Sequence, residues 1–128
     1  MLQRNLASIL DDVIHCAEFI SLRRDRTTLE KFLQDEETQA MFERKFEVIG
    51  EALGLLRKNS PEIFARIRHS KGAVDFRNVI IHAYSFIDHE AMWDIALRLL
   101  PYYLRTRTFN ASNLSEHLVA PAVRKLLA

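Results

Sequence analysis

Apolar residues recur at intervals of three and four along four long stretches of the chain, as they do in amphipathic α-helices. In the first stretch, for example, Ile9, Val13 and Ala17 share one helical face. The pattern predicts long helices over about residues 2–21, 35–58 and 73–84, and a fourth from residue 88 onward. Shorter apolar stretches after residues 28 and 60 predict one or two short helices. Four main helices with short connections indicate an all-α fold, an antiparallel up-and-down helical bundle.

Short polar side chains stand where several of these helices should begin. Such residues cap helices by accepting hydrogen bonds from free backbone N–H groups of the first turn. The candidate caps are Thr27 or Thr28, Asp35, Ser60 with Pro61 at the first helical position, and Asp88. Pro101 falls inside the apolar pattern of the last helix, and we expect a kink or a break there, after which residues 102–104 continue or restart the helix.

Length and composition agree with a single helical domain. The chain has 128 residues, with only 3 glycines and 3 prolines, whereas sheet proteins need many turns rich in both. We expect the domain to span residues 1–116, and we leave the tail, residues 117–128, unplaced. No apolar run is long enough to cross a membrane, and the single cysteine, Cys16, fits a core position in a reduced, cytoplasmic protein. The net charge of +1 gives no overall argument for nucleic-acid binding.

Gly50 interrupts the second long helix, where it should cost about 1 kcal/mol relative to alanine. A close crossing with another helix would offset that cost. The neighbouring Glu51 would then lie in or near the interior and need a cation such as Arg77, or it would face solvent. The sequence leaves both alternatives for Glu51 open.

The third long helix carries four polar side chains in a short apolar run, Arg77, Asn78, His82 and Tyr84. The helix is apolar nearly all round, so we expect it to be buried on several sides, in the bundle centre or at a subunit interface. Asn78 and His82 share a face, whereas Arg77 and His82 lie about 140° apart around the helix. A second copy of the helix across a two-fold axis could bring the arginine and the histidine together.

An acid/base histidine near a phosphate-binding arginine suits RNA cleavage without a metal. The 2′-OH of the RNA attacks the adjacent phosphate, the histidine moves protons and the arginine stabilises the charge on phosphorus. His82 has no metal-ligating residue at the usual helical spacings, and no glycine-rich phosphate loop is present. A basic cluster just before this helix, Arg66, Arg68 and Lys71, is either a set of RNA contacts or a solvated loop.

The segment Arg77-Asn78-x-x-x-His82-x-Tyr84 closely resembles the signature of the HEPN superfamily and, within it, of the HepT-type toxins. Ile87-Asp88, Trp93 and Leu100-Pro101 follow it in the same order, and residues 46–52 resemble a second signature on the preceding long helix. The resemblance implies a homodimer formed through the motif helix, with a composite ribonuclease site in the dimer cleft. Arg77 and His82 match the catalytic positions, and Asn78 the polar position between them. Ala83 stands where many relatives have glycine.

The resemblance also implies a partner, an MntA-like nucleotidyltransferase antitoxin. That enzyme would transfer AMP from ATP onto Tyr84, and the added phosphate would block RNA entry beside Arg77 and His82. The toxin itself would need no cofactor. Two other interpretations stay open: a non-catalytic HEPN module that binds nucleotide or nucleic acid and docks a nucleotidyltransferase, and a purely structural bundle with His82 and Tyr84 in its core.

Overall fold

The computed structural model describes residues 5–83 and 86–106, and all regular secondary structure within these ranges is helical. Tyr84, the expected domain boundary at residue 116 and the tail 117–128 lie outside the described residues. The helices are α1 (Leu6–Asp25), α2 (Leu29–Phe32), α3 (Glu36–Asn59), α4 (Pro61–Arg66), α5 (Ser70–His82) and α6 (His89–Leu104). Four long helices and two short ones confirm the predicted all-α fold.

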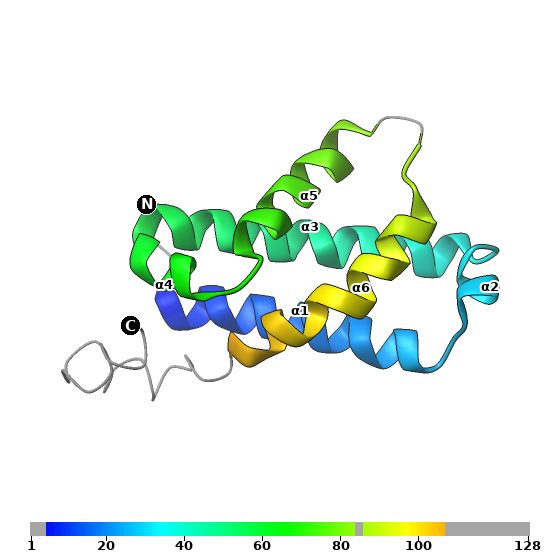
Figure 1. Cartoon of the computed structure of the whole chain (residues 1–128), viewed down its shortest axis with the longest axis horizontal. Coiled ribbons are helices and arrows are strands. Elements are labelled where there is room, and N and C mark those ends of the chain that lie inside the picture. The colour runs from blue at the N-terminus through cyan, green and yellow to red at the C-terminus, as the bar shows by residue number, and fades with distance from the viewer. Residues whose placement is uncertain (1–4, 84–85, 107–128) are drawn as a thin grey trace.

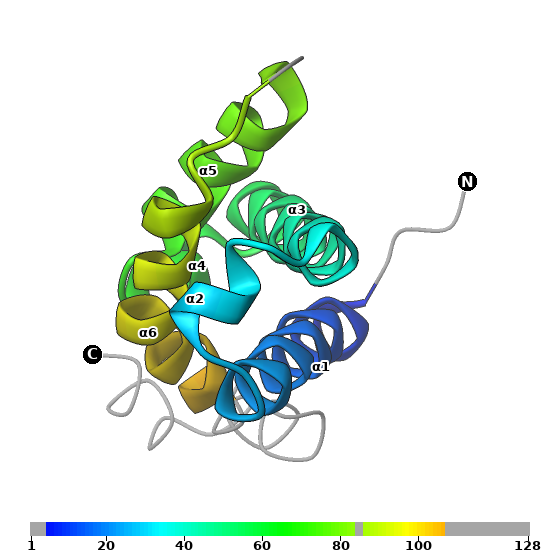
Figure 2. The ribbon, with the colours of Figure 1, turned by 90° about the vertical axis from the view of Figure 1, so that its right-hand side faces the viewer.

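The long helices run in alternating directions, as an up-and-down bundle requires (Figure 1). α1 and α3 pack side by side, α6 lies against α1, and α5 packs on α3 (Figure 2). The far end of α5 projects away from the rest of the bundle (Figures 1 and 2). No helix in the described part of the chain is both long and apolar enough to span a bilayer.

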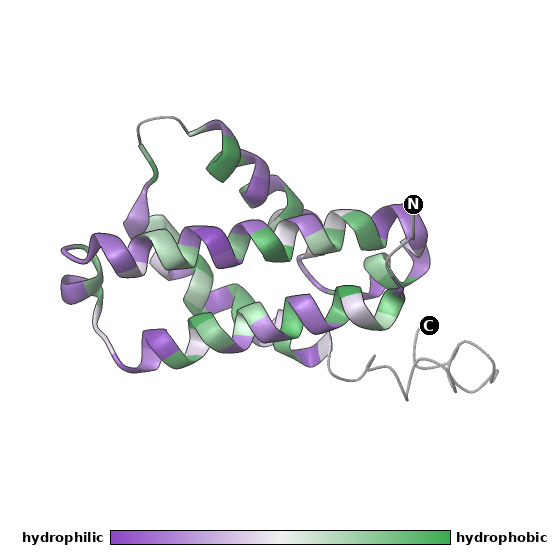
Figure 3. Cartoon of the chain, turned by 180° about the vertical axis from the view of Figure 1, so that it is seen from behind, coloured by the Kyte–Doolittle hydropathy of each residue, from purple (hydrophilic) through white to green (hydrophobic). Residues whose placement is uncertain are grey.

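Apolar and polar residues alternate along α1 and α3, as the hydropathy colouring shows (Figure 3). The buried faces meet in one core, in which Cys16 is 4% exposed. Burial raises the pKa of the Cys16 thiol, which packs in the core as a small apolar group. The largest fully buried side chains of this core are Tyr103, Phe32, Phe42, Ile9, Leu10, Ile20, Ile49, Leu53, Leu56, Ile63, Met92 and Leu100.

Most of the predicted caps are confirmed. Thr28, Asp35 and Asp88 each accept a hydrogen bond from a backbone N–H three residues later, at 3.3, 3.1 and 3.0 Å. Hydrogen bonds from Thr38 hold the pKa of the Asp35 carboxyl below its ordinary value of 3.8. Ser60 makes no side-chain cap, although the proline after it does open α4.

Both predicted ends of α1 were wrong, and the helix ends at Asp25 instead of about residue 21. α1 begins at Leu6, after the unpredicted cap Asn5, whose side chain accepts from Ser8 N at 2.8 Å. Of the two alternatives after Pro101, the one in which the helix continues is correct, and α6 runs to Leu104. Leu100 and Tyr103 on either side of the proline are both 1% exposed, and their burial offsets the hydrogen bond that the proline cannot donate.

The motif helix α5 is buried on one side only, so of the two alternatives for it the bundle centre was wrong. Ala73, Val74 and Ile80 face the core, whereas Val79 is 57% and Ile81 39% exposed. Helix α5 also starts three residues earlier than predicted, after His69, whose backbone is left-handed with φ 63°. The alternative for its apolar outer side, a subunit interface, stays a prediction.

Candidate functional site

Gly50 allows α3 and α5 to approach closely at the site. A Cβ atom placed on Gly50 would lie 2.2 Å from Cβ of Arg77 and 2.7 Å from the backbone oxygen of Ala73. Only a residue without a side chain fits such a crossing. The close crossing predicted at Gly50 is therefore confirmed, and it positions Arg77 directly against α3.

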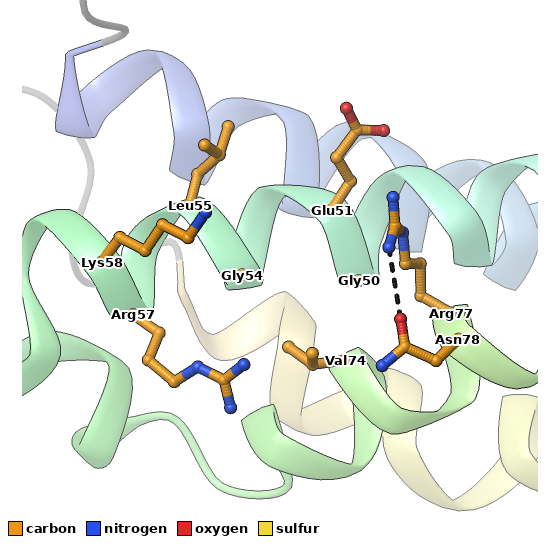
Figure 4. A pocket seen from close by; sticks show the side chains of 9 residues that line it. All are labelled: Gly50, Glu51, Gly54, Leu55, Arg57, Lys58, Val74, Arg77 and Asn78. Carbon is orange, nitrogen blue, oxygen red and sulfur yellow. Dashed lines mark hydrogen bonds between the residues drawn. The ribbon is translucent and has the colours of Figure 1, made fainter.

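A pocket of about 290 Å³ opens beside this crossing (Figure 4). Two predicted site residues from α5 and one from α3 meet in it: Arg77, Asn78 and Glu51. Three cationic side chains and one carboxylate line it, so its local charge is positive although the chain is nearly neutral. The lining residues are Gly50, Glu51, Gly54, Leu55, Arg57, Lys58, Val74, Arg77 and Asn78.

Arg77 is half-buried in this pocket with unused hydrogen-bond donors. Its Nη1 donates to Asn78 Oδ1 at 3.2 Å, and Figure 4 shows the two side chains turned toward each other. Its Nε is buried and, among the described residues, has no hydrogen-bond partner. A guanidinium has five N–H donors, and leaving one buried without an acceptor is costly unless a ligand supplies that acceptor.

Glu51 lines the same pocket but is exposed. Of the two alternatives that the sequence left open for Glu51, the position near the interior is therefore wrong, and the solvent-facing position is correct. Successive residues turn about 100° around a helix, so Glu51 faces away from the crossing that Gly50 makes. Within the described ranges, no ion pair joins Glu51 to Arg77.

Arg57 and Lys58 were not identified as site residues from the sequence. Both are exposed, and both reach into the pocket from the C-terminal part of α3 (Figure 4). A signal was present, because Glu51, Gly54 and Lys58 follow one another at helical spacings of three and four. Their significance could be recognised only with α5 in place opposite them.

His82 does not line this pocket. It is the last residue of α5 and is exposed, and Ala83 after it forms the C-cap. One chain thus holds Arg77 and Asn78 in a pocket and presents His82 separately at the outer end of the same helix. This matches the large angle between Arg77 and His82 expected from helix geometry.

The basic cluster of Arg66, Arg68 and Lys71 spans the end of α4 to the first turn of α5, is exposed and lies outside the pocket. Lys71 forms an ion pair with Asp75 at 2.8 Å. The guanidinium of Arg68 lies 5.3 Å from the centroid of the Tyr102 ring, and Arg66 ends α4. The structure therefore does not bring Arg66, Arg68 or Lys71 to Arg77, and any contact they make with RNA is at a different surface.

Metal-ligating side chains do not cluster in the residues that the structure covers. Across residues 5–83 and 86–106, no group of three or more His, Cys, Asp and Glu side chains could hold a metal ion. The chemistry that the described site offers is that of a guanidinium, an amide, a separate imidazole and the ammonium and guanidinium groups of α3.

Comparison with known proteins gives one consistent picture. Residues 13–107 match the family described as Ribonuclease HepT-like. A proposed RNase of Methanocaldococcus jannaschii is 33% identical over 104 residues, which cover 79% of this chain and 83% of that protein. A protein named "Probable ribonuclease HepT" from Thermococcus cleftensis is 29% identical over 103 residues, covering 78% of this chain and 90% of that protein. No solved structure matches the chain significantly.

Proposed function

Since the chain belongs to the Ribonuclease HepT-like family, we propose that it is the toxin of a toxin–antitoxin pair, an endoribonuclease that cleaves RNA without a metal. The observation that carries this proposal is the state of Arg77. Its buried Nε lacks an acceptor within the described chain, and Arg57 and Lys58 add positive charge to the same pocket. A phosphodiester supplies both the acceptor oxygens and the negative charge that this arrangement lacks.

In the proposed reaction the 2′-oxygen of one ribose attacks the adjacent phosphorus. His82 accepts the proton from the 2′-OH, the bond from phosphorus to the 5′-oxygen breaks, and an imidazolium returns a proton to that oxygen. Arg77 donates hydrogen bonds to the phosphate oxygens as charge grows on them, and Asn78 holds its guanidinium. The products are a 2′,3′-cyclic phosphate and a free 5′-OH, with no other reactant.

A homodimer would complete the site. On and after α5, the apolar side chains of Val79, Ile81 and Phe86 are exposed, the last of them 77%. Burying these side chains against a second copy is favourable, and it would bring the two α5 helices together. His82 of one chain would then approach Arg77 of the other, which supports a composite site in the dimer cleft.

Expression of the wild-type chain in bacteria is expected to arrest growth, and His82→Ala or Arg77→Ala should restore it. His82 is exposed and Arg77→Ala keeps the Cβ atom packed on Gly50, so both variants should accumulate as folded protein. Growth curves and soluble protein levels measure the two effects together. Growth arrest by soluble alanine variants would show that these residues are not catalytic.

Co-expression with an MntA-like nucleotidyltransferase is expected to add AMP to Tyr84 and relieve the arrest. The tyrosine follows His82 by two residues, so an attached phosphate would compete with RNA for Arg77. Intact-mass measurement should show an increase of one or more adenylate units that disappears in Tyr84→Phe. The same mass increase in Tyr84→Phe, or none in the wild type, would refute modification at this residue.

The second candidate function, a non-catalytic module that binds nucleotide and docks a nucleotidyltransferase, is favoured by one observation. The pocket that holds Arg77 and Asn78 does not contain His82. If the protein is such a module, the pocket binds phosphate, and His82→Ala changes neither bacterial growth nor the cleavage of RNA. The growth experiment therefore separates the two functions.

A further inference from the structure

A second hollow, of about 440 Å³, lies between the turn before α5 and the last turns of α6. It shares no lining residue with the pocket around Arg77. Its lining combines apolar and cationic side chains: His69, Ile95, Arg98, Leu99 and Tyr102. A cavity of this size falls within the range of about 300–1,000 Å³ that is usual for ligand pockets.

Tyr102 is the centre of this hollow. The guanidinium carbons of Arg68 and Arg105 lie 5.3 and 5.1 Å from the centroid of its ring. The imidazole of His69 meets the ring edge-on, with the ring centroids 4.8 Å apart. These four residues, Arg68, His69, Tyr102 and Arg105, are called the Tyr102 cluster below. Both distances lie within the roughly 6 Å at which a cation is attracted to the face of an aromatic ring.

A hydrogen bond from the neighbouring Tyr103 holds the Tyr102 cluster in place. Tyr103 is 1% exposed, and its hydroxyl donates a hydrogen bond of 3.2 Å to the backbone oxygen of His69. Burial raises the pKa of Tyr103, so its hydroxyl keeps the proton that it donates. This bond ties the left-handed turn at His69 to α6, and Tyr102 next to Tyr103 is fixed with it.

The cationic side chains around the hollow differ in whether a carboxylate pairs with them. Arg98 at the edge of the hollow pairs with Asp94 one turn before it on α6. Neither Arg68 nor His69 has a carboxylate partner in the part of the chain that the structure describes, and both are exposed. Arg68 therefore brings a positive charge without a carboxylate partner beside Tyr102, at a hollow whose lining also includes the apolar side chains of Ile95 and Leu99.

We infer that the Tyr102 cluster binds a single-stranded segment of RNA outside the cleavage site, with a base against Tyr102 and the apolar lining of the hollow and a phosphate on the Arg68 guanidinium. Proteins that bind single strands combine aromatic side chains for bases with cations for phosphates in this way. The inference rests on the proposed ribonuclease function, since it concerns how that substrate is held.

Helix geometry places this segment several nucleotides from the cut. Along α5, His69 precedes Arg77 by about 12 Å and His82 by about 20 Å, at 1.5 Å per residue. A strand advances at least about 3.4 Å per nucleotide, so RNA must be several nucleotides long to occupy both places. The cluster thus favours longer single strands over very short ones.

The test is binding of the full-length protein to a fluorescent 2′-O-methyl RNA of about twelve nucleotides, which cannot undergo attack by a 2′-OH. Fluorescence anisotropy should show that Tyr102→Ala and Arg68→Ala each raise the Kd about 10-fold, whereas Tyr102→Phe keeps the ring and binds like the wild type. Arg26→Ala, an exposed arginine at the end of α1, removes the same charge elsewhere and should change the Kd less than about 2-fold. Arg68→Ala should also reduce the dependence of log Kd on log salt by about 0.7.

The inference would be overturned if both Tyr102→Ala and Arg68→Ala bound the RNA as tightly as the wild type. It would also be overturned if Arg26→Ala lost as much affinity as they do, or if the wild type bound no RNA. Thermal unfolding shows whether Tyr102→Ala is folded, and the exposed Arg68 gives a variant that does not depend on packing. Cleavage of unmodified RNA is measured separately. If the wild type did not cleave RNA, the proposed ribonuclease function would be refuted. Weaker RNA binding by Tyr102→Ala and Arg68→Ala would in that case still support binding at the Tyr102 cluster.

Discussion

His82→Ala and Arg77→Ala are each expected to slow RNA cleavage by the purified protein at least about 100-fold. Proton transfer by a positioned side chain contributes about 10²- to 10⁴-fold, and one donor to a developing oxyanion about 10²- to 10³-fold. Neither change should unfold the protein. His82 is exposed, and alanine at position 77 retains the one carbon atom that lies closest to Gly50. Initial rates on a labelled RNA, with thermal unfolding of each variant, measure both quantities.

Matched controls exist on other helices. His15 on α1 and Arg44 on α3 are exposed and far from the motif in sequence, and Arg44 forms an ion pair with Glu47 at 2.9 Å. His15→Ala and Arg44→Ala should cleave RNA at the wild-type rate. Folded His82→Ala and Arg77→Ala proteins that keep more than about a tenth of wild-type activity would remove both residues from the mechanism.

Gly50→Ala is expected to be the most damaging change that adds only one carbon atom. The new Cβ would meet Cβ of Arg77 at 2.2 Å and the backbone oxygen of Ala73 at 2.7 Å, and neither atom can rotate away. Helix α5 must therefore shift. Overpacking of this kind costs about 1–3 kcal/mol and occasionally more. A displacement of about 1 Å in the motif helix should also lower cleavage about 10²-fold.

Gly54→Ala is the internal control, because it makes the same substitution one turn later on α3. A Cβ there meets nothing within 4 Å, and alanine is favoured over glycine inside a helix by up to about 1 kcal/mol. Denaturant or thermal unfolding should thus show Gly54→Ala at or above wild-type stability and Gly50→Ala below it. Equal stabilities for the two variants would contradict the close crossing of α3 and α5.

Local rules of sequence were sufficient for most of the fold. Thr28, Asp35 and Asp88 could be identified as caps because a cap depends only on the residues within one turn of it. Gly50 was informative for a similar reason, since a glycine inside an apolar helix has few explanations other than a close contact. At Pro101 the sequence left a break or a continued helix open, because the cost of a proline is local, whereas the burial of Leu100 and Tyr103 that offsets the cost depends on the assembled core.

The site was less accessible to sequence reasoning, because its parts come from two helices. Arg77 and Asn78 could be found by their pattern, but the face of α3 opposite them could not. Arg57 and Lys58 look like ordinary basic residues at the end of a helix until α5 is placed across from them. Glu51 differs from Gly50 by only one position, yet that turn of about 100° moves it from the helix crossing to solvent.

The most direct test of the central claim, that Arg77 and His82 cleave RNA without a metal, is incubation of the wild-type protein with RNA in excess EDTA. The products are analysed for the chemistry of their ends. We expect cleavage to continue at the rate seen without EDTA and to leave 2′,3′-cyclic phosphate and 5′-OH ends, because the 2′-OH is the nucleophile. Loss of cleavage in EDTA that added metal restores, or products ending in 3′-OH and 5′-phosphate, would contradict the claim.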